Sequence, residues 1–228
     1  MTTLATRETK DRVNSVRSWV AAIDTSSDRA GVALFDGVDV AVLSWNAHRN
    51  HTVDTLAQLD HLLRLGGLTL HQLDGVAIAT GPGSFSALRV GLSIAKGLAF
   101  SLGLPLAGIS TTSAIAASAG PADRPIIPVM PAGRGRVVWS RYPGVEADAH
   151  QNTTVDELRA VMNAEHAMVV SESPLPGIGN VLVLPAGARV EQIARLGWPR
   201  IRDGERDDPA ALEPMYVHGR GSPEATAV

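Results

Sequence analysis

Two short stretches of this 228-residue chain carry residue types that could contact a phosphate or a metal ion. The first, Asp24-Thr25-Ser26, follows an apolar run and places an acid and two hydroxyls at a turn. The second, Gly81-Pro82-Gly83-Ser84, separates an apolar run from a long apolar segment. A carboxylate can hold a cation, and a glycine-rich turn before a helix can present N–H groups to an anion. Both stretches are also compatible with ordinary turns whose side chains satisfy nearby backbone.

The second stretch does not fit the common phosphate or nucleophile motifs. A Walker loop requires lysine and a hydroxyl after its last glycine, whereas Gly83 is followed by Ser84 and Phe85. The dinucleotide fingerprint fails because Ser86 replaces its third glycine. A nucleophile elbow around Ser84 would need glycines where the chain has Pro82 and Ser86. We therefore expect a sharp turn with Ser84 as a helix N-cap, with anion binding at this helix end as the alternative.

The remaining candidates for chemistry are weak. The chain has no cysteine, which excludes disulfides, thiolate metal sites and a cysteine nucleophile. His48 and His51 are three residues apart, but a metal site would require a nearby acid, and the HExxH motif of zinc proteases is absent. The sequence thus predicts no metal site and no catalytic residue.

Composition limits the choice of partners. Hydrophobic residues make up 45% of the chain and charged residues 19%, as in compact globular proteins. The net charge of -3 provides no overall basic field, so we expect contact with RNA only through another protein. Residues 1–18 lack the apolar core of a signal peptide, and no apolar run approaches the length of a membrane span. We expect a cytoplasmic protein without a membrane segment.

The elements that would hold these turns can be read from hydrophobic periodicity and turn residues. Apolar runs at 19–24, 30–35 and 38–45 predict a three-stranded antiparallel meander, with Asp36-Gly37 as a hairpin signal. Beyond the meander the pattern alternates helices and strands. These are a helix from a Thr52 cap to Leu65, a strand at 75–80, a helix at 84–102, a strand at 104–110 and a short helix to 119.

The helix at 84–102 is apolar around almost its whole circumference. Only Arg89, Ser93 and Lys96 interrupt two apolar stripes. A helix that lies on one sheet needs a single apolar face, so something else must cover the second face. Gly91 and Ala95, one turn apart, would let another helix approach closely. We expect that cover to be another protein, with the chain's own second lobe as the alternative.

Four prolines between 121 and 131 mark the crossing into a weaker second half. We expect strands at 125–130, 136–142, 167–171 and 181–185, and helices at 155–163 and 188–197. The expected domains are a disordered leader at 1–18, a first lobe at 19–119, a smaller second lobe at 120–218 and a disordered tail at 219–228.

Several motifs resemble those of the TsaB (YeaZ) family. These are AIDTSS and GVALF near the start, GPGSFSALRVGLSIAKGLA in the middle and Pro214-Met215-Tyr216-Val217 near the end. The central block of the family usually reads GPGSFTGLRIG, from which Ser86, Ala87 and Val90 depart conservatively. The second lobe departs further, with Pro131-Ala132-Gly133-Arg134 where the family commonly has an Asp-Ala-Arg-like strand start.

The resemblance implies an α/β fold of the actin-like, Hsp70-like ATPase (ribonuclease H-like) type, with two lobes and a reduced second lobe. It also implies a catalytically silent scaffold required for threonylcarbamoyl transfer to adenosine in tRNA. Such a scaffold binds the transferase TsaD, is joined by the ATPase TsaE, forms a homodimer in their absence and meets tRNA only indirectly. No cofactor is implied, except a nucleotide at an interface shared with TsaD.

In the family the helices at 52–65 and 84–102 form the packing surface. The residues expected there are Leu56, Leu59, Leu63, Leu88, Gly91, Leu92, Ala95 and Ala99. Leu92→Glu is therefore expected to abolish the complex while the protein stays folded.

The same resemblance makes Asp24, Thr25 and Ser26 a vestigial phosphate loop, with an ordinary hydroxyl turn as the alternative. A rival function of another class is a small ATP-dependent kinase or ATPase in which Asp24 holds the metal. Its nearest candidate for a glycine-rich nucleotide contact in the second lobe is the loop 177–180. A metal-dependent peptidase is a more distant rival.

Overall fold

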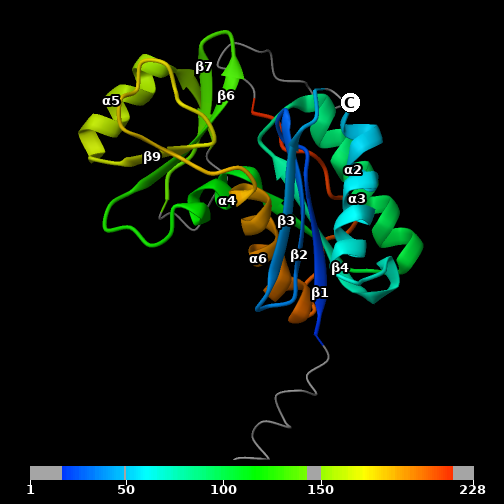
Figure 1. Cartoon of the computed structure of the whole chain (residues 1–228). Helices are drawn as coiled ribbons and strands as arrows, with labels where there is room; N and C mark the ends of the chain where they lie inside the picture. Colours follow the sequence, from blue (N-terminus) through cyan, green and yellow to red (C-terminus); the bar gives the residue numbers. More distant parts are fainter. Residues whose placement is uncertain (1–16, 49, 143–149, 218–228) are drawn as a thin grey trace, which may run out of the picture.

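The computed structural model describes residues 17–48, 50–142 and 150–217, which form two lobes, each built on a five-stranded sheet (Figure 1). The leader expected at 1–18 lies outside these residues except for its last two positions. The tail expected at 219–228 lies outside them entirely.

The first sheet has the strand order β3-β2-β1-β4-β5. Strands β1, β2 and β3 pair antiparallel, whereas β4 is parallel to β1 and β5 is parallel to β4. The expected meander, and the expected order of elements in the first half, are confirmed. The strands are β1 (Trp19–Asp24), β2 (Arg29–Phe35), β3 (Val40–Asn46), β4 (Leu73–Gly81) and β5 (Leu106–Ser110).

Helices cover both faces of this sheet, because alternate residues of its strands are apolar and buried on opposite sides. One cluster joins the sheet to α2 (His51–Leu65) and α3 (Phe85–Leu102), and the other joins it to α6 (Ala188–Arg202). Figure 1 shows α2 and α3 on one side of the strands and α6 on the other. The short 3-10 turn η1 (Leu70–Gln72) leads into β4.

The second sheet repeats the topology of the first. Its order is β10-β9-β6-β7-β8, with β6, β7 and β8 antiparallel, β9 parallel to β6 and β10 parallel to β9. Three antiparallel strands followed by two parallel ones are thus common to both lobes, as expected for an actin-like, ribonuclease H-like fold. The strands are β6 (Ile126–Gly133), β7 (Arg136–Trp139), β8 (Gln151–Thr154), β9 (Met168–Ser171) and β10 (Val181–Val183), of which β8 was not predicted.

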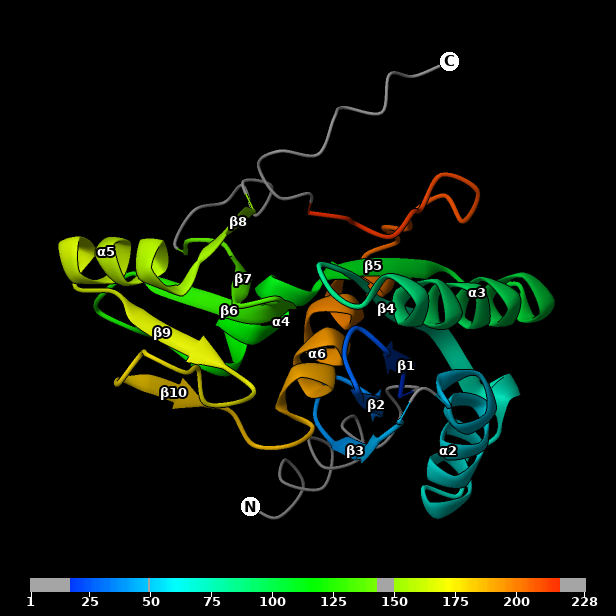
Figure 2. The same cartoon turned by 90° about the horizontal axis from the view of Figure 1, so that it is seen from above.

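The second lobe is reduced, as expected. In the first lobe α3 links β4 to β5, whereas a loop at 172–180 links β9 to β10. One face of the second sheet is covered by α5 (Val155–Glu165), and α4 (Thr111–Ser118) packs on the other. Figure 2 shows α4 between the two lobes, where it also contacts α6.

The expected boundaries of the second lobe, 120–218, are wrong at the C-terminal end. Helix α6 packs on β1, β2 and β4 of the first sheet, and Met215 N–H donates to the Thr80 carbonyl at 2.7 Å. Without α6, one apolar face of the first sheet would be exposed to water. The chain therefore returns to the first lobe after β10.

Two helix starts and one helix end also differ from expectation. Helix α2 begins at His51 after Asn50, so Thr52 lies inside the helix and does not cap it. Ser84 is the N-cap residue of α3, but its hydroxyl accepts no N–H from the first turn. Helix α6 extends to Arg202 through Pro199, beyond the expected end at 197.

Candidate functional site

The two turns singled out in the sequence form one structural unit. Ser84 N–H donates to the Ser26 carbonyl at 2.7 Å, and Thr25 Oγ1 donates to the Ala87 carbonyl at 2.7 Å. A Cβ on Gly83 would clash with the Ser26 carbonyl, so this close approach requires glycine. The motif Gly81-Pro82-Gly83-Ser84 thus fixes the start of α3 against the turn that follows β1.

Gly91 has a similar role nearly two turns into α3. A Cβ at this position would overlap the Thr25 hydroxyl, so glycine lets α3 lie directly on the turn after β1. We expected Gly91 and Ala95 to admit a helix of another protein. Instead both are buried against the chain's own first lobe.

Both carboxylate oxygens of Asp24 are engaged by the chain itself. Oδ1 accepts from Ser26 N at 2.9 Å and from Ser26 Oγ at 2.7 Å. Oδ2 accepts from Nε of Arg189, and both side chains are buried. An acid that binds a metal must offer an oxygen to it, so this geometry counts against Asp24 as the metal ligand of a kinase or ATPase. The bonds from Ser26 to Asp24 are those of the hydroxyl-turn alternative, and the vestigial phosphate loop stays a prediction.

Sequence reasoning missed Arg189, the second residue of α6. Its position carried a signal, because Arg189, Ile193, Gly197 and Ile201 recur at four-residue steps on the buried face of the helix. The first turn of a helix is also an unfavourable place for a cation. An arginine with both features predicts a buried guanidinium with anionic partners.

A cleft of about 660 Å³ opens between the lobes beside this ion pair. The loop Ser26–Arg29 and the start of α3 at Ser84 line it from the first lobe, and Glu172 lines it from the second. Burial raises the pKa of Glu172 above its ordinary value, and the opposing effect of Arg189 only partly offsets this. Burial lowers the pKa of Arg189, but Asp24 and Glu172 outweigh it and hold the pKa above its ordinary value.

The residues expected to form the partner surface are mostly buried inside the chain. On α2, Leu59 and Leu63 face the sheet. On α3, the side chains of Leu88, Leu92, Ala95 and Ala99 are buried as well. All the predicted residues except Leu56 are thus buried in the chain's own core, because α2 and α3 pack on the first sheet with these side chains facing inward. A partner surface on these helices would have to use other residues.

The opposite side of the two helices carries apolar side chains that the chain leaves exposed. We define the α2–α3 outer face by Val53, Leu56, Leu65 and Phe100. Phe100 is the most open, at 91% exposure, and Val53 and Leu65 are 74% and 70% exposed. Phe85 of α3 is also exposed, but it lines the cleft between the lobes, and its ring centroid lies 4.6 Å from that of Tyr216. The α2–α3 outer face is where the structure leaves apolar surface uncovered on the expected packing helices.

Gly97 lies on the outer side of α3 and has no role in the fold. A Cβ there would meet no atom within 4 Å, unlike the Cβ at Gly91. Glycine in a helix interior costs about 1 kcal/mol relative to alanine. Ser93 and Ser101 lie one turn to either side and are also exposed, so a shallow strip of small residues runs beside Phe100. Such a strip lets a second helix approach closely.

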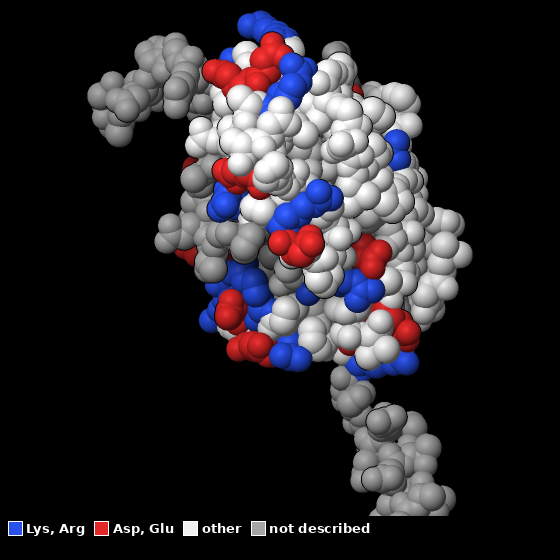
Figure 3. All heavy atoms as spheres, turned by 90° about the vertical axis from the view of Figure 1, so that its left-hand side faces the viewer, with Lys and Arg blue, Asp and Glu red and all other residues white. Residues whose placement is uncertain are grey.

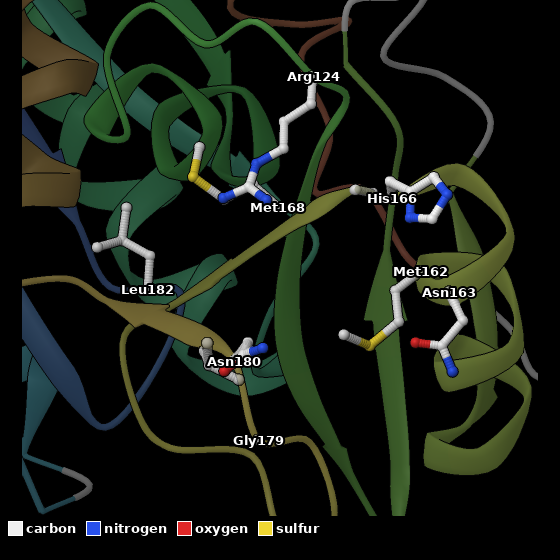
Figure 4. Close-up of a pocket in the computed structure, with 10 residues that line it drawn as sticks. Arg124, Met162, Asn163, His166, Met168, Gly179, Asn180 and Leu182 are labelled. Carbon is white, nitrogen blue, oxygen red and sulfur yellow. The ribbon is translucent and has the colours of Figure 1, made fainter.

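A second hollow lies in the second lobe, away from the ion pair (Figure 4). It has a volume of about 720 Å³ and includes Gly179 and Asn180 of the predicted glycine-rich loop, with Arg124 and His166. It shares no lining residue with the cleft between the lobes. The glycine-rich loop therefore does not join Asp24 in one nucleotide site.

Surface charge, groups of metal-binding residues and apolar helices add few candidates for a functional site. On the face in Figure 3, acidic and basic side chains lie next to one another and form no continuous basic surface. Within the described ranges, no three His, Asp or Glu residues are grouped so that they could hold a metal ion. Helix α3 is long and apolar enough to cross a membrane by composition, but core helices of soluble proteins also pass that test.

Comparisons with known proteins agree on one pathway. Residues 42–200 match the family model described as TsaD: tRNA N6-adenosine threonylcarbamoyltransferase. The chain is 32% identical over 207 residues to the tRNA threonylcarbamoyladenosine biosynthesis protein TsaB of Escherichia coli K12, covering 87% of this chain and 84% of that protein. It is 35% identical over 125 residues to TsaB of Buchnera aphidicola, covering 54% of this chain and 60% of that protein.

Among solved structures, YeaZ from Pseudomonas aeruginosa superimposes with a TM-score of 0.69 at 23% identity. The match covers 88% of this chain and 100% of that structure. At this level of identity the likeness concerns the fold.

Proposed function

Because the chain belongs to the TsaB (YeaZ) family of tRNA threonylcarbamoyladenosine biosynthesis proteins, we propose that it is a catalytically silent scaffold that binds TsaD through the α2–α3 outer face. In this proposal TsaD carries out threonylcarbamoyl transfer to adenosine in tRNA, and the ATPase TsaE joins the pair. The assembly works in the cytoplasm.

The observation that carries the proposal is the exposure of Phe100 beside Gly97. The Phe100 ring is 91% exposed, so its apolar surface is in contact with water. Burying this ring in an interface would contribute about 2 kcal/mol to binding. Gly97 provides room for a partner backbone next to that ring. A few large side chains, often aromatic, that become fully buried carry most of the binding free energy of a protein interface.

The same face accounts for the proposed homodimer. The TsaD family model matches most of this chain, which supports related folds in TsaD and the scaffold. Two related folds can offer similar helix pairs to each other, so a second copy would use the surface otherwise covered by TsaD. We therefore propose that TsaD and a second copy compete for the α2–α3 outer face.

The net charge of the chain supports a role in which it does not bind tRNA directly. The chain has a net charge of -3, whereas proteins that grip nucleic acid usually present a basic surface. In this proposal tRNA contacts TsaD, and any nucleotide binds at the boundary with TsaD. The engagement of both Asp24 oxygens supports a scaffold that performs no phosphoryl transfer itself.

The proposal is tested by measuring the affinity of purified chain for TsaD from the same organism. Phe100→Ala should weaken binding at least tenfold, because the lost burial is worth more than 1.4 kcal/mol. Its thermal midpoint should change little, since the side chain has few contacts within the chain. A reconstituted tRNA modification assay at limiting scaffold should show the same loss.

Val38→Ala is the matched control. Val38 is 79% exposed in the turn between β2 and β3, outside both helices, so its substitution should leave affinity and modification unchanged. Equal affinity of Phe100→Ala and the unaltered chain for TsaD would overturn the assigned surface. Full modification without this chain would overturn the scaffold role.

A further inference from the structure

Beside the cleft between the lobes lies a buried cation that belongs to the chain itself, the guanidinium of Arg189. The side chain of Arg189 is only 1% exposed, although a buried guanidinium is stable only when ion pairs and hydrogen bonds compensate for its lost hydration. The groups that accept hydrogen bonds from Arg189 therefore indicate which kind of cation this site suits.

Four oxygen atoms converge on this guanidinium. Nε donates to Asp24 Oδ2 and Nη1 donates to Glu172 Oε2. Nη2 donates to Ser27 Oγ and to the Arg29 carbonyl, both at 3.0 Å. Two carboxylates, one hydroxyl and one carbonyl are the oxygen types that hard divalent cations prefer.

The two carboxylates come from different lobes. Asp24 ends β1 in the first sheet, and Glu172 follows β9 in the second. Because β4 and β9 are topological equivalents, Glu172 occupies the place that Pro82 has in the first lobe. Across the cleft, two carboxylates would repel each other if no cation stood between them.

We propose that Arg189 is a resident cation in a four-oxygen site between the lobes, where it takes the place of a divalent metal ion and ties Glu172 of the second lobe to Asp24 of the first. The chain thereby keeps its lobes joined without a bound ion. Shortening Arg189 converts the same oxygens into a site for Ca²⁺ or Mn²⁺.

The test compares Arg189→Ala with the unaltered chain by thermal unfolding, with CaCl₂ or MnCl₂ added from 0 to about 10 mM, a range that brackets weak carboxylate sites. Arg189→Ala should lower the midpoint by roughly 10 °C, because it removes the cation that neutralises the carboxylates of Asp24 and Glu172. Either salt should raise that midpoint saturably, and neither should raise the midpoint of the unaltered chain. Adding Asp24→Asn to Arg189→Ala should abolish the rescue. A rescue absent from Arg189→Ala, or equal with Asp24→Asn, would overturn the metal-site equivalence.

Glu172→Gln provides a second test that does not depend on the stability of Arg189→Ala. It removes the link to the second lobe while Arg189 stays paired with Asp24. Hydrogen exchange should accelerate in β9 and the loop 172–180, while β1 and β4 keep their protection. Unchanged exchange throughout the second lobe would overturn the link between the lobes.

Discussion

The α2–α3 outer face and the region of the cleft between the lobes differ in whether the chain covers and pairs their side chains. On the outer face, Phe100 and its apolar neighbours are open to water. Beside the cleft, Arg189 and Asp24 are buried and paired within the same chain. The first region leaves apolar side chains exposed, whereas the second pairs its charged side chains within the chain. This difference is what the proposed scaffold role requires, namely an apolar surface free to bind another protein and an Asp24 whose carboxylate oxygens are already engaged within the chain.

The largest loss of stability should come from a substitution on the side of α3 that faces the core. Leu92 is 4% exposed in the main core, so Leu92→Ala should lower the free energy of unfolding by about 2–5 kcal/mol. Leu92→Glu should prevent folding, contrary to the sequence-based expectation that it would act only on the complex. Denaturant unfolding of Leu92→Ala beside Phe100→Ala measures the contrast. Similar stability of the two variants would show that inner and outer sides do not differ as described.

Much of the first lobe followed from its sequence. The hairpin signal at Asp36-Gly37 and the apolar runs predicted the meander, and Gly83 with Ser84 predicted a sharp turn before α3. These features are local, so residues near in sequence determine them.

The open side of α3 could not be predicted in the same way. Periodicity showed that α3 has two apolar stripes, but which neighbour covers each stripe depends on how α2 packs. The return of α6 to the first sheet is likewise a long-range contact. The buried Arg189 was detectable in principle, as a charge on the apolar stripe of a helix.

A smaller change in the free energy of unfolding, of opposite sign, should come from substituting Gly97. Gly97→Gln adds a good helix former at a position where a Cβ meets nothing within 4 Å. The free energy of unfolding should rise by about 0.5–1 kcal/mol, as measured by denaturant titration. Gly91→Gln, the matched substitution at the buried glycine, should destabilise the chain because it clashes with Thr25. A loss of stability in Gly97→Gln would mean that Gly97 has a packing role within the chain.

The smallest effect should be a pH dependence in the cleft. Burial raises the pKa of Glu172 above its ordinary value of 4.5, so the folded chain binds this proton more tightly than the unfolded chain. Ionising Glu172 therefore costs more free energy in the folded chain than in the unfolded chain, so the free energy of unfolding decreases as pH rises from about 4.5 through the raised pKa. Unfolding free energies from pH 4 to pH 8 should decline less in Glu172→Gln than in the unaltered chain. A parallel pH dependence in both proteins would contradict this cause.

The affinity of Gly97→Gln for TsaD is the most direct test of the central claim, because this variant separates folding from assembly. The account predicts a chain that is more stable than the unaltered protein and yet binds TsaD at least tenfold more weakly, since the new side chain fills the space reserved for the partner. Unchanged affinity in a properly folded Gly97→Gln protein would contradict it.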